Sequence, residues 1–288
     1  MKIDWSNKSH EYQTIAFDYL LSYSSDMQVL TNQDIPAVLQ YIAGEKEVNL
    51  FIEGDIELYG LESDVVNLYA FGDDWDCLVL RFYENFLLTS NKAQPDLQPV
   101  VEFLKKQTML CLSAKESLLL DIQQYFPANK VQGTYLCRLN KQTFKMEASA
   151  DRDIVKLGPS DAQAIIDLYK QIEEFAKPYI EHESEKLKQT KETYEKGCLG
   201  FGIFNNGQLV CMANIAAKTQ SGAMIIGVAT HPSYRKRGYA SQVMSRLCSQ
   251  CFTDGLSFLC LFYSNPLAGA IYHRLGFETI GRWGMMKF

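Results

Sequence analysis

Residues 225–240 read IIGVATHPSYRKRGYA, and this stretch decides the fold. Its first six residues form an apolar run typical of a buried strand, and a basic turn then leads into an expected helix over residues 241–252. The first backbone N–H groups of a helix have no partner within the helix and point outward. Together with the positive end of the helix dipole, they favour binding of an anion such as a pyrophosphate. The sequence therefore predicts an anion site where this strand turns into this helix.

The residues of the turn favour the same interpretation. Gly238 lacks a Cβ and allows an oxygen atom to approach the backbone closely, while Ala240 keeps the next inward position small. Arg235 and Arg237 can add charge-assisted hydrogen bonds to phosphate oxygens. The alternative is a solvated run of charge, but cations at a helix N-terminus oppose the dipole by roughly 0.3–1 kcal/mol each. Three successive cations, with Lys236 in the middle, are better explained by an anion among them.

Around this stretch, the second half of the chain predicts an ordered series of strands and helices. The Gly-Pro-Ser-Asp sequence at 158–161 introduces a helix, with Ser160 as its expected cap. Asn205-Asn206-Gly207 predicts a hairpin turn, because Asn-Gly tolerates positive φ. Strands are expected over 154–157, 199–204, 208–217, 223–230, 258–263 and after Gly276, with helices over 162–172, 181–196, 241–252 and 266–275.

The first half has a similar order of elements. Strands are expected over 65–71, 77–83, 86–89, 108–112 and 134–139, with helices over 97–105 and 115–126. Where the second half has its basic glycine turn, however, residues 91–96 read NKAQPD and supply neither the glycine nor the arginines. We therefore expect a tandem repeat whose first copy cannot hold the ligand. An unrelated α+β domain is the alternative for this half.

The composition is that of a globular protein, with 47 % hydrophobic and 22 % charged residues in 288. No apolar run is long enough to span a bilayer, and the N-terminus does not read as a secretory signal, so we expect a cytoplasmic protein that does not bind a membrane. The domain boundary is expected in the polar stretch 141–153, giving domains over 1–145 and 150–288. The fold class expected from the predicted strands and helices is α/β (α+β).

Charge is divided unevenly between the halves. Residues 1–150 carry 12 Lys and Arg against 21 Asp and Glu, a net charge of −9, and residues 151–288 carry 16 against 13, a net charge of +3; the sum is −6. The mildly basic half suits an anionic ligand, and the acidic half favours a cationic substrate. The pI of about 5.4 and the lack of a basic stripe indicate no nucleic-acid binding.

The eight cysteines predict neither disulfides nor a metal site. Five of them lie in apolar, strand-like runs, where cysteine behaves as a small buried hydrophobe. Cys248 and Cys251 form one CxxC in a helical pattern without a second pair or a nearby histidine, so a structural thiol pair is expected. No metal ligands are predicted.

The stretch from residue 224 to residue 277 resembles the acetyl-CoA-binding region of GNAT N-acetyltransferases (the GCN5-related family), whose motif is Q/R-x-x-G-x-G/A between the fourth strand and the third helix. Here the motif is Arg235-x-x-Gly238-x-Ala240. The similarity continues through SNP at 264–266 and AIYHRLGF at 270–277, where the family has an asparagine that begins the fourth helix, a tyrosine on that helix and a Gly-Phe. The overall character is similar to FR47-like and glycine N-acyltransferase-like members, some of which carry a degenerate GNAT-like first half.

This resemblance implies a GNAT fold with a splayed mixed sheet in the C-terminal half, and acetyl-CoA (coenzyme A) as co-substrate. The backbone of Val228, Ala229 and Thr230 would pair with the pantetheine arm, and Asn265 would contact it. Tyr272 would protonate the leaving thiolate. The pyrophosphate would be held by the turn and the start of the helix: Arg235, Lys236, Arg237, Gly238, Tyr239 and Ala240.

The implied reaction is direct attack of a neutral primary amine, of a small molecule or peptide, on the acyl carbonyl, polarised by a backbone N–H of the strand, expected to be that of Val228. The sequence departs from the commoner pattern because the strand over 223–230 contains no glutamate. Residues of the acceptor region, Glu174, Glu181, His182 and Glu183, are more simply solvated surface, and His231 is expected to cap or pack. No base is assigned.

Two other functions stay open at this point. A non-catalytic acyl-CoA-binding sensor on the same fold is favoured by the missing strand carboxylate. A tandem relative that transfers aminoacyl groups from charged tRNA is disfavoured by the acidic composition.

Overall fold

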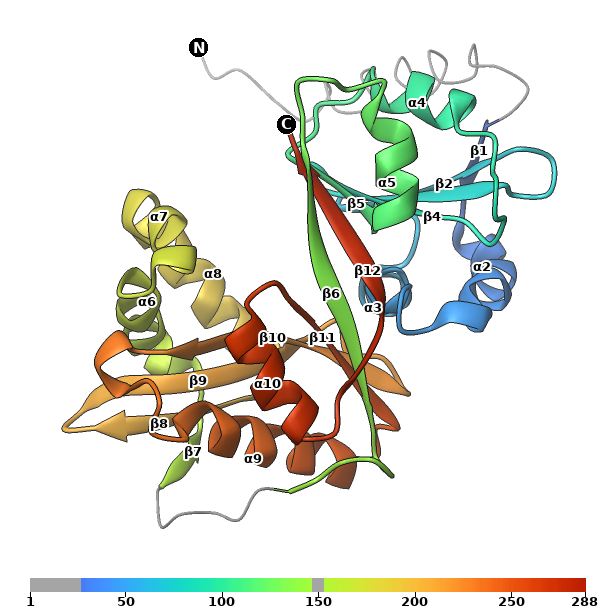
Figure 1. The fold of residues 1–288 in the computed structure, drawn as a ribbon. Coiled ribbons are helices and arrows are strands. Elements are labelled where there is room, and N and C mark those ends of the chain that lie inside the picture. Colours follow the sequence, from blue (N-terminus) through green and yellow to red (C-terminus); the bar gives the residue numbers. More distant parts are fainter. Residues whose placement is uncertain (1–26, 147–152) are drawn as a thin grey trace, which may run out of the picture.

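The computed structural model describes residues 27–146 and 153–288. These residues form a twelve-stranded open mixed sheet in the order β1-β2-β3-β4-β5-β12-β6-β11-β10-β9-β8-β7 (Figure 1). The predicted α/β class with a mixed sheet is therefore confirmed. None of the helices in the described ranges is both long and apolar enough to cross a membrane.

The N-terminal half contains two helices that the sequence patterns do not predict, α2 and α3. Its fifth strand begins at Cys111 rather than at residue 108, because pairing with the preceding strand starts at Asn85 and Cys111. The elements of this half are β1 (Met27–Leu30), α2 (Ile35–Ile42), α3 (Leu50–Tyr59), β2 (Val66–Phe71), β3 (Cys77–Phe82), β4 (Asn85–Thr89), α4 (Gln98–Leu104), β5 (Cys111–Lys115), α5 (Glu116–Gln123) and β6 (Val131–Asn140).

The C-terminal half follows the predicted order closely. Asn206 and Gly207 both have positive φ, 50° and 78°, as expected for the hairpin turn. Ser160 is not the cap; the Asp161 carboxylate instead accepts a hydrogen bond from the backbone N–H of Gly158 at 2.8 Å. The elements are β7 (Ile154–Lys156), α6 (Ala162–Lys170), α7 (Glu173–Glu181), α8 (Glu183–Glu195), β8 (Gly200–Asn205), β9 (Gln208–Ala216), β10 (Gly222–Thr230), α9 (Tyr239–Thr253), β11 (Phe258–Tyr263), α10 (Pro266–Arg274) and β12 (Glu278–Lys287).

The two halves share their last strands. Strand β12 lies between β5 and β6, and β6 lies between β11 and β12, so each half receives a strand from the other. The β6–β12 pair is antiparallel from Arg138 and Glu278 to Val131 and Met286, and Figure 1 shows it running between the halves. Each half also has one parallel pair, β4–β5 and β10–β11. The predicted boundary lies in the stretch 141–153, of which residues 147–152 lie outside the described residues, and the division into two domains stays a prediction.

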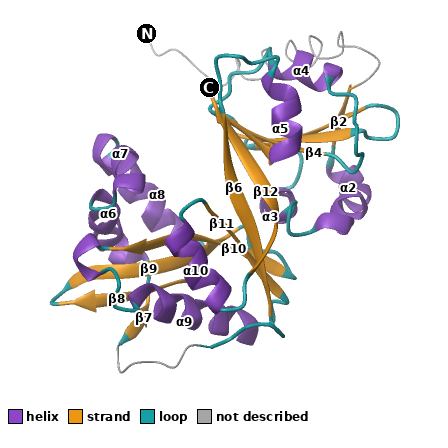
Figure 2. Cartoon of the chain, viewed as in Figure 1, coloured by secondary structure: helices purple, strands orange, loops and turns teal. Residues whose placement is uncertain are grey.

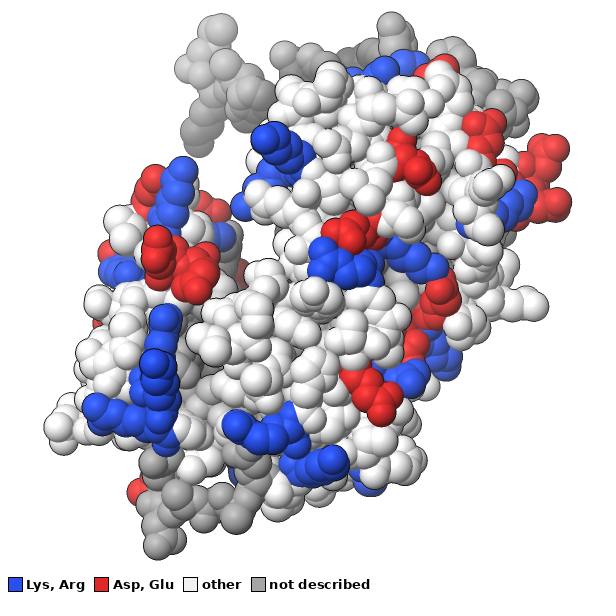
Figure 3. Space-filling view, in the orientation of Figure 1, with Lys and Arg blue, Asp and Glu red and all other residues white. Residues whose placement is uncertain are grey.

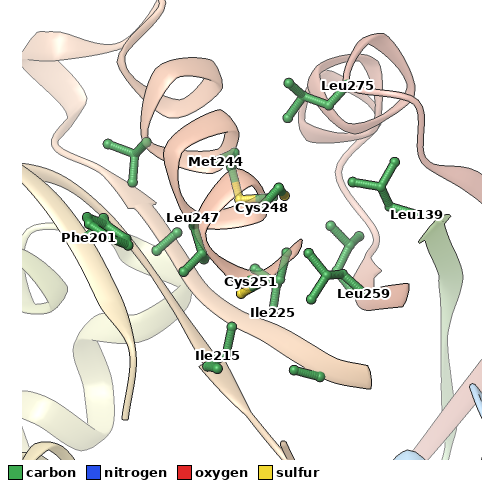
Figure 4. Close-up of a cluster of buried hydrophobic side chains, with 14 of the residues drawn as sticks. Leu139, Phe201, Ile215, Ile225, Met244, Leu247, Cys248, Cys251, Leu259 and Leu275 are labelled. Atoms are coloured by element: carbon green, nitrogen blue, oxygen red, sulfur yellow. The ribbon is translucent and has the colours of Figure 1, made fainter. Parts of the chain in front are cut away.

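Helices cover both faces of the C-terminal sheet (Figure 2). On one face, α9 and α10 pack on the strands in a core that includes Met244, Leu247 and Leu259 (Figure 4). Cys248 and Cys251 are buried free thiols in this core, as the structural interpretation of the CxxC expects. Among the described residues, no group of three His, Cys, Asp or Glu side chains could hold a metal ion.

The opposite face of this sheet is covered by helices from both halves. One part is packed by α6 and α8, whose Ile165 and Tyr194 share a core with Met212 of β9. Another part is packed by α3 of the N-terminal half, whose Leu50 lies in a cluster with Met224 of β10.

Candidate active site

Strands β10 and β11 separate before β10 ends. Their parallel pairing runs from Gly222 and Phe258 to Ile225 and Leu261. In the described residues, the last five residues of β10 have no partner on the β11 side. Backbone groups at such a strand edge can pair with an extended ligand as if it were another strand. The structure thus provides the splayed gap that the sequence predicts.

A β-bulge lies at the point where the strands separate. Ile226 pairs with Asn214 of β9, but the next pair is Ala229 with Met212, so two residues of β10 face one residue of β9. These two residues are Gly227 and Val228, and a bulge of this kind takes its residues out of the regular ladder. Gly227 has a φ of +60°, which favours glycine. The Val228 N–H predicted to polarise a carbonyl therefore belongs to irregular backbone.

The turn after β10 is built by local hydrogen bonds. The Nδ1 atom of His231 accepts a hydrogen bond from the backbone N–H of Ser233 at 3.2 Å and caps the short 3₁₀ helix η4 (Pro232–Tyr234). The capping role expected for His231 is therefore confirmed. The Arg235 guanidinium donates through Nε to the Thr230 carbonyl at 3.3 Å, which holds the end of the turn against the end of the strand.

The basic part of the turn then leads directly into α9. Lys236 and Gly238 both have left-handed backbone, with φ of 62° and 76°, and Gly238 is the N-cap. The Arg237 guanidinium lies 5.2 Å from the centre of the Tyr234 ring. Arg235, Lys236, Arg237 and Gly238 are all exposed. Figure 3 shows Lys and Arg side chains gathered where this turn lies in Figure 1. An exposed cationic turn at the N-terminus of a fifteen-residue helix fits a diphosphate.

Helix α10 carries the remaining predicted residues, Asn265 and Tyr272. Asn265 is its N-cap, and its side-chain oxygen accepts a hydrogen bond from the Leu267 N–H at 2.9 Å. The side-chain amide nitrogen of Asn265 is the group left to meet a ligand. At the other end of α10, the Arg274 guanidinium donates to the Ser241 hydroxyl of α9 at 2.9 Å, which joins the two helices.

Tyr272 is a buried residue of α10 on the face that packs on the sheet. It is 6 % exposed, and its ring lies 5.8 Å from that of Tyr263 on β11. Burial raises the pKa of Tyr272 to about 12, and the thiols of Cys137 and Cys211 add to the rise. Those thiols belong to β6 and β9, which flank the β11–β10 pair. At neutral pH Tyr272 is therefore a protonated phenol near the gap between the strands.

The corresponding segment of the N-terminal half is closed to an anion. The Asp96 carboxylate accepts a hydrogen bond from the Gln98 N–H at 3.0 Å, so a negative charge already occupies the start of α4. Lys92 is paired with Asp76. The position seven residues after Lys115, which matches the spacing from Asn265 to Tyr272, is Ile122 and carries no proton donor. These residues explain why we expect only the second half to bind the ligand.

Of the charged residues on the acceptor side, Glu183 has a clear partner. Its carboxylate is paired with Lys170, which lowers its pKa and makes it a weaker base. A polar cluster beneath the bulge, formed by Tyr169, Tyr194 and Asn214, was not predicted from the sequence. One signal was present, because Asn214 is a polar residue inside the otherwise apolar run LVCMANIA at 209–216.

The comparisons with known proteins agree with this geometry. The sequence matches the GNAT acetyltransferase family over residues 89–286, which is more than half of the chain. The chain therefore belongs to the GNAT acetyltransferase family, as the motif around Arg235 predicted. Its fold is that of acyl-CoA-dependent N-acetyltransferases in general. No curated protein matches the sequence.

Several solved structures share the fold at low sequence identity. A Drosophila protein has a TM-score of 0.66 at 13 % identity and covers 91 % of this chain and 98 % of its own. A GCN5-related N-acetyltransferase from Kribbella flavida has a TM-score of 0.54 at 15 % identity, covering 74 % of this chain and 86 % of its own. A tandem GNAT protein from the clavulanic acid biosynthesis pathway has a TM-score of 0.58 at 11 % identity, covering 91 % and 98 %. The fold similarity thus extends over both halves.

Proposed function

We propose that this chain transfers an acyl group, acetyl in the simplest case, from acetyl-CoA to a primary amine of a small molecule or peptide. The observation that carries the proposal is the bulge at Gly227 and Val228, which lies near the start of an unpaired strand edge that leads to a cationic helix N-terminus. A polarising amide, a strand edge and a diphosphate site in this order match the acyl group, the pantetheine arm and the diphosphate of an extended acyl-CoA. When bound, acetyl-CoA supplies the activated acyl carbonyl.

The family resemblance gives each of these residues a proposed role. The backbone of residues 228–230 binds the pantetheine arm, and the turn at 235–240 binds the pyrophosphate. The Val228 N–H polarises the acyl carbonyl. Tyr272 donates its proton to the departing sulfur, and Asn265 contacts the pantetheine through its free amide nitrogen. The attacking amine must be neutral, and we assign no base to it.

The site lies in the proposed C-terminal domain, residues 150–288. The proposed N-terminal domain, residues 1–145, contributes strand β6 and helix α3 to the surroundings of the site. A cytoplasmic location and the absence of nucleic-acid and membrane partners remain predictions from the sequence.

The second candidate is a non-catalytic acyl-CoA sensor. It is favoured by strand β10, which reads GAMIIGVAT and has no carboxylate to deprotonate the amine. Binding without turnover would distinguish it from the transferase.

Binding and turnover can be measured separately on the full chain. Acetyl-CoA at 100 times its Kd stabilises a protein by about 2.7 kcal/mol, and we expect a rise in Tm of about 5 °C or more. A panel of primary amines, with detection of the released thiol, should then identify an acceptor. No rise in Tm at millimolar acetyl-CoA would contradict both candidates. A rise in Tm without thiol release from any amine would favour the sensor.

The Tyr272→Phe variant tests the proton donor. It removes a single hydroxyl and retains the ring packing against Tyr263. We expect kcat to fall by about 10²-fold or more, the usual range for a general acid, while the Kd for acetyl-CoA changes less than about twofold. Steady-state kinetics and calorimetry give the two numbers. Unchanged kcat would remove the acid role from Tyr272.

A further inference from the structure

Three buried polar side chains lie directly beneath the bulge, and the proposed mechanism does not use them. They are Asn214 of β9, Tyr169 of α6 and Tyr194 of α8, which we call the Asn214 cluster. Each is 7 % exposed or less. Their surroundings are otherwise apolar, including Met212 and Ala229. Buried polar groups are costly unless they are paired, so the arrangement of this cluster requires an explanation.

The Asn214 side chain lies near both tyrosine hydroxyls. The Tyr194 hydroxyl donates a hydrogen bond to Asn214 Oδ1. The Tyr169 hydroxyl lies on the Nδ2 side of the same amide, because a Cβ at Gly227 would meet both groups. The Asn214 amide is thus bonded to one hydroxyl group and lies near a second one from a different helix.

Glycines on both neighbouring strands make room for this cluster. Asn214 pairs with Gly200 of β8 and with Ile226 of β10, the residue just before Gly227. A Cβ at Gly200 would overlap Asn214 Oδ1 and the Tyr194 hydroxyl, and a Cβ at Gly227 would overlap the Tyr169 hydroxyl. That second Cβ would also lie 3.3 Å from Asn214 Nδ2. The Tyr169 hydroxyl therefore rests against the backbone of the bulge itself.

Helix α7 holds the Tyr169 ring in place. The ring centroids of Phe175 and Tyr179 lie 5.2 Å and 4.7 Å from that of Tyr169. Burial strongly raises the pKa of Tyr169, so its hydroxyl stays neutral and cannot act as the missing base. A fixed, neutral hydroxyl packed on a bulge is suited to hold backbone in position.

We propose that Tyr169 is a positioning residue: its hydroxyl, which packs on Gly227 beside the Asn214 amide, fixes the bulge and aims the Val228 N–H at the acyl carbonyl. This inference rests on the proposed function of that N–H. Its consequence is specific. The proposed pyrophosphate turn lies after the strand and not at the bulge, so loss of the hydroxyl should weaken catalysis but not the binding of acetyl-CoA.

The test compares Tyr169→Phe with the wild-type chain. A small displacement of a catalytic group can cost about 10²-fold in rate, and we expect kcat to fall about tenfold or more, with the KM for acetyl-CoA within about twofold. Tyr59→Phe is the matched control, because it removes the same atom from a half-buried tyrosine that packs on Phe82 in the other half. Its kcat should equal that of the wild type. If Tyr169→Phe does not fold, Tyr194→Phe removes the hydrogen bond to Asn214 instead and should lower kcat about threefold or more.

A second readout does not depend on turnover. Amide hydrogen exchange over residues 224–230 should be about tenfold faster in Tyr169→Phe than in wild type, because the bulge loses its support, and unchanged in Tyr59→Phe. Wild-type kcat together with wild-type exchange in the variant would overturn the positioning role. So would a loss of kcat matched by an equal loss of acetyl-CoA affinity. A wild-type chain that releases no thiol would contradict the proposed function alone, and the exchange rates would still decide the role of Tyr169.

Discussion

Replacing Arg237 with Glu and Gly238 with Asp in one variant is expected to abolish the rise in Tm that acetyl-CoA causes. The change removes a guanidinium from the exposed turn and places two carboxylates at the N-terminus of α9. A lost charge-assisted hydrogen bond costs about 1.5–3 kcal/mol, and a side chain at position 238 blocks the close approach of a phosphate oxygen to the backbone. Together with charge repulsion, these losses weaken binding by more than about 100-fold.

A matched control separates this effect from a general change of charge. Lys196→Glu with Gly197→Asp alters the net charge by the same amount, and it also replaces a left-handed glycine, with φ of 92°. Both control residues are exposed at the end of α8. The control should keep the full rise in Tm. A double variant at the turn that also keeps it would place the acyl-CoA site elsewhere in the chain.

The second large effect concerns Asp55 in helix α3. Burial raises the pKa of this carboxyl from 3.8 to about 7. Helix α3 packs closely on the C-terminal half next to Asp55. A Cβ at the adjacent Gly54 would lie 3.1 Å from the Cα of Ala217. The folded state therefore binds the Asp55 proton more tightly than the unfolded state does. Asp55 thus costs no stability below about pH 4, costs more as the pH rises, and reaches its full cost above pH 7.

Replacing Asp55 with Asn should remove this cost. The difference between 3.8 and about 7 corresponds to about 4 kcal/mol, and we expect the variant to be more stable by up to that amount at pH 8. The gain should shrink as the pH falls and vanish near pH 4. Urea unfolding at several pH values measures it. Glu57→Gln, on an exposed position of the same helix, should change stability by less than about 0.5 kcal/mol. An Asp55→Asn variant that is no more stable than wild type at pH 8 would refute the assignment.

Local patterns in the sequence predicted most elements of the C-terminal half because each signal is short-range. The Asn206-Gly207 turn, the apolar strand before the basic turn, and Asn265 before Pro266 each act through neighbouring residues. Helix α7 was not predicted, and Pro178 inside it interrupts the helical pattern. Ser160 failed as a cap because Asp161 performs that role one residue later.

The sharing of β6 and β12 could not be predicted, because strand partners far apart in sequence leave no local signal. Glu278 pairs with Arg138 across 140 residues, and no feature of either strand's sequence identifies its partner. The Asn214 cluster could not be predicted from the sequence for the same reason. Its tyrosines lie on separate helices, and only the fold brings Tyr169 and Tyr194 to one side chain. The turn at 235–240 could be proposed as a binding site from the sequence because its residues are contiguous.

The exchanged strands also interlock the two halves mechanically. A separately produced C-terminal half would lack β6, the strand that lies between β11 and β12. The unpaired backbone edges of β11 and β12 would then favour aggregation. Neither half can complete its sheet until the ten residues of β12 have been synthesised and have docked against β5 and β6. Folding therefore depends on contacts between remote parts of the chain, which makes it slow. Once formed, the pair resists hinge bending, so access to the gap beside β10 depends on loops and helices rather than on the halves swinging apart.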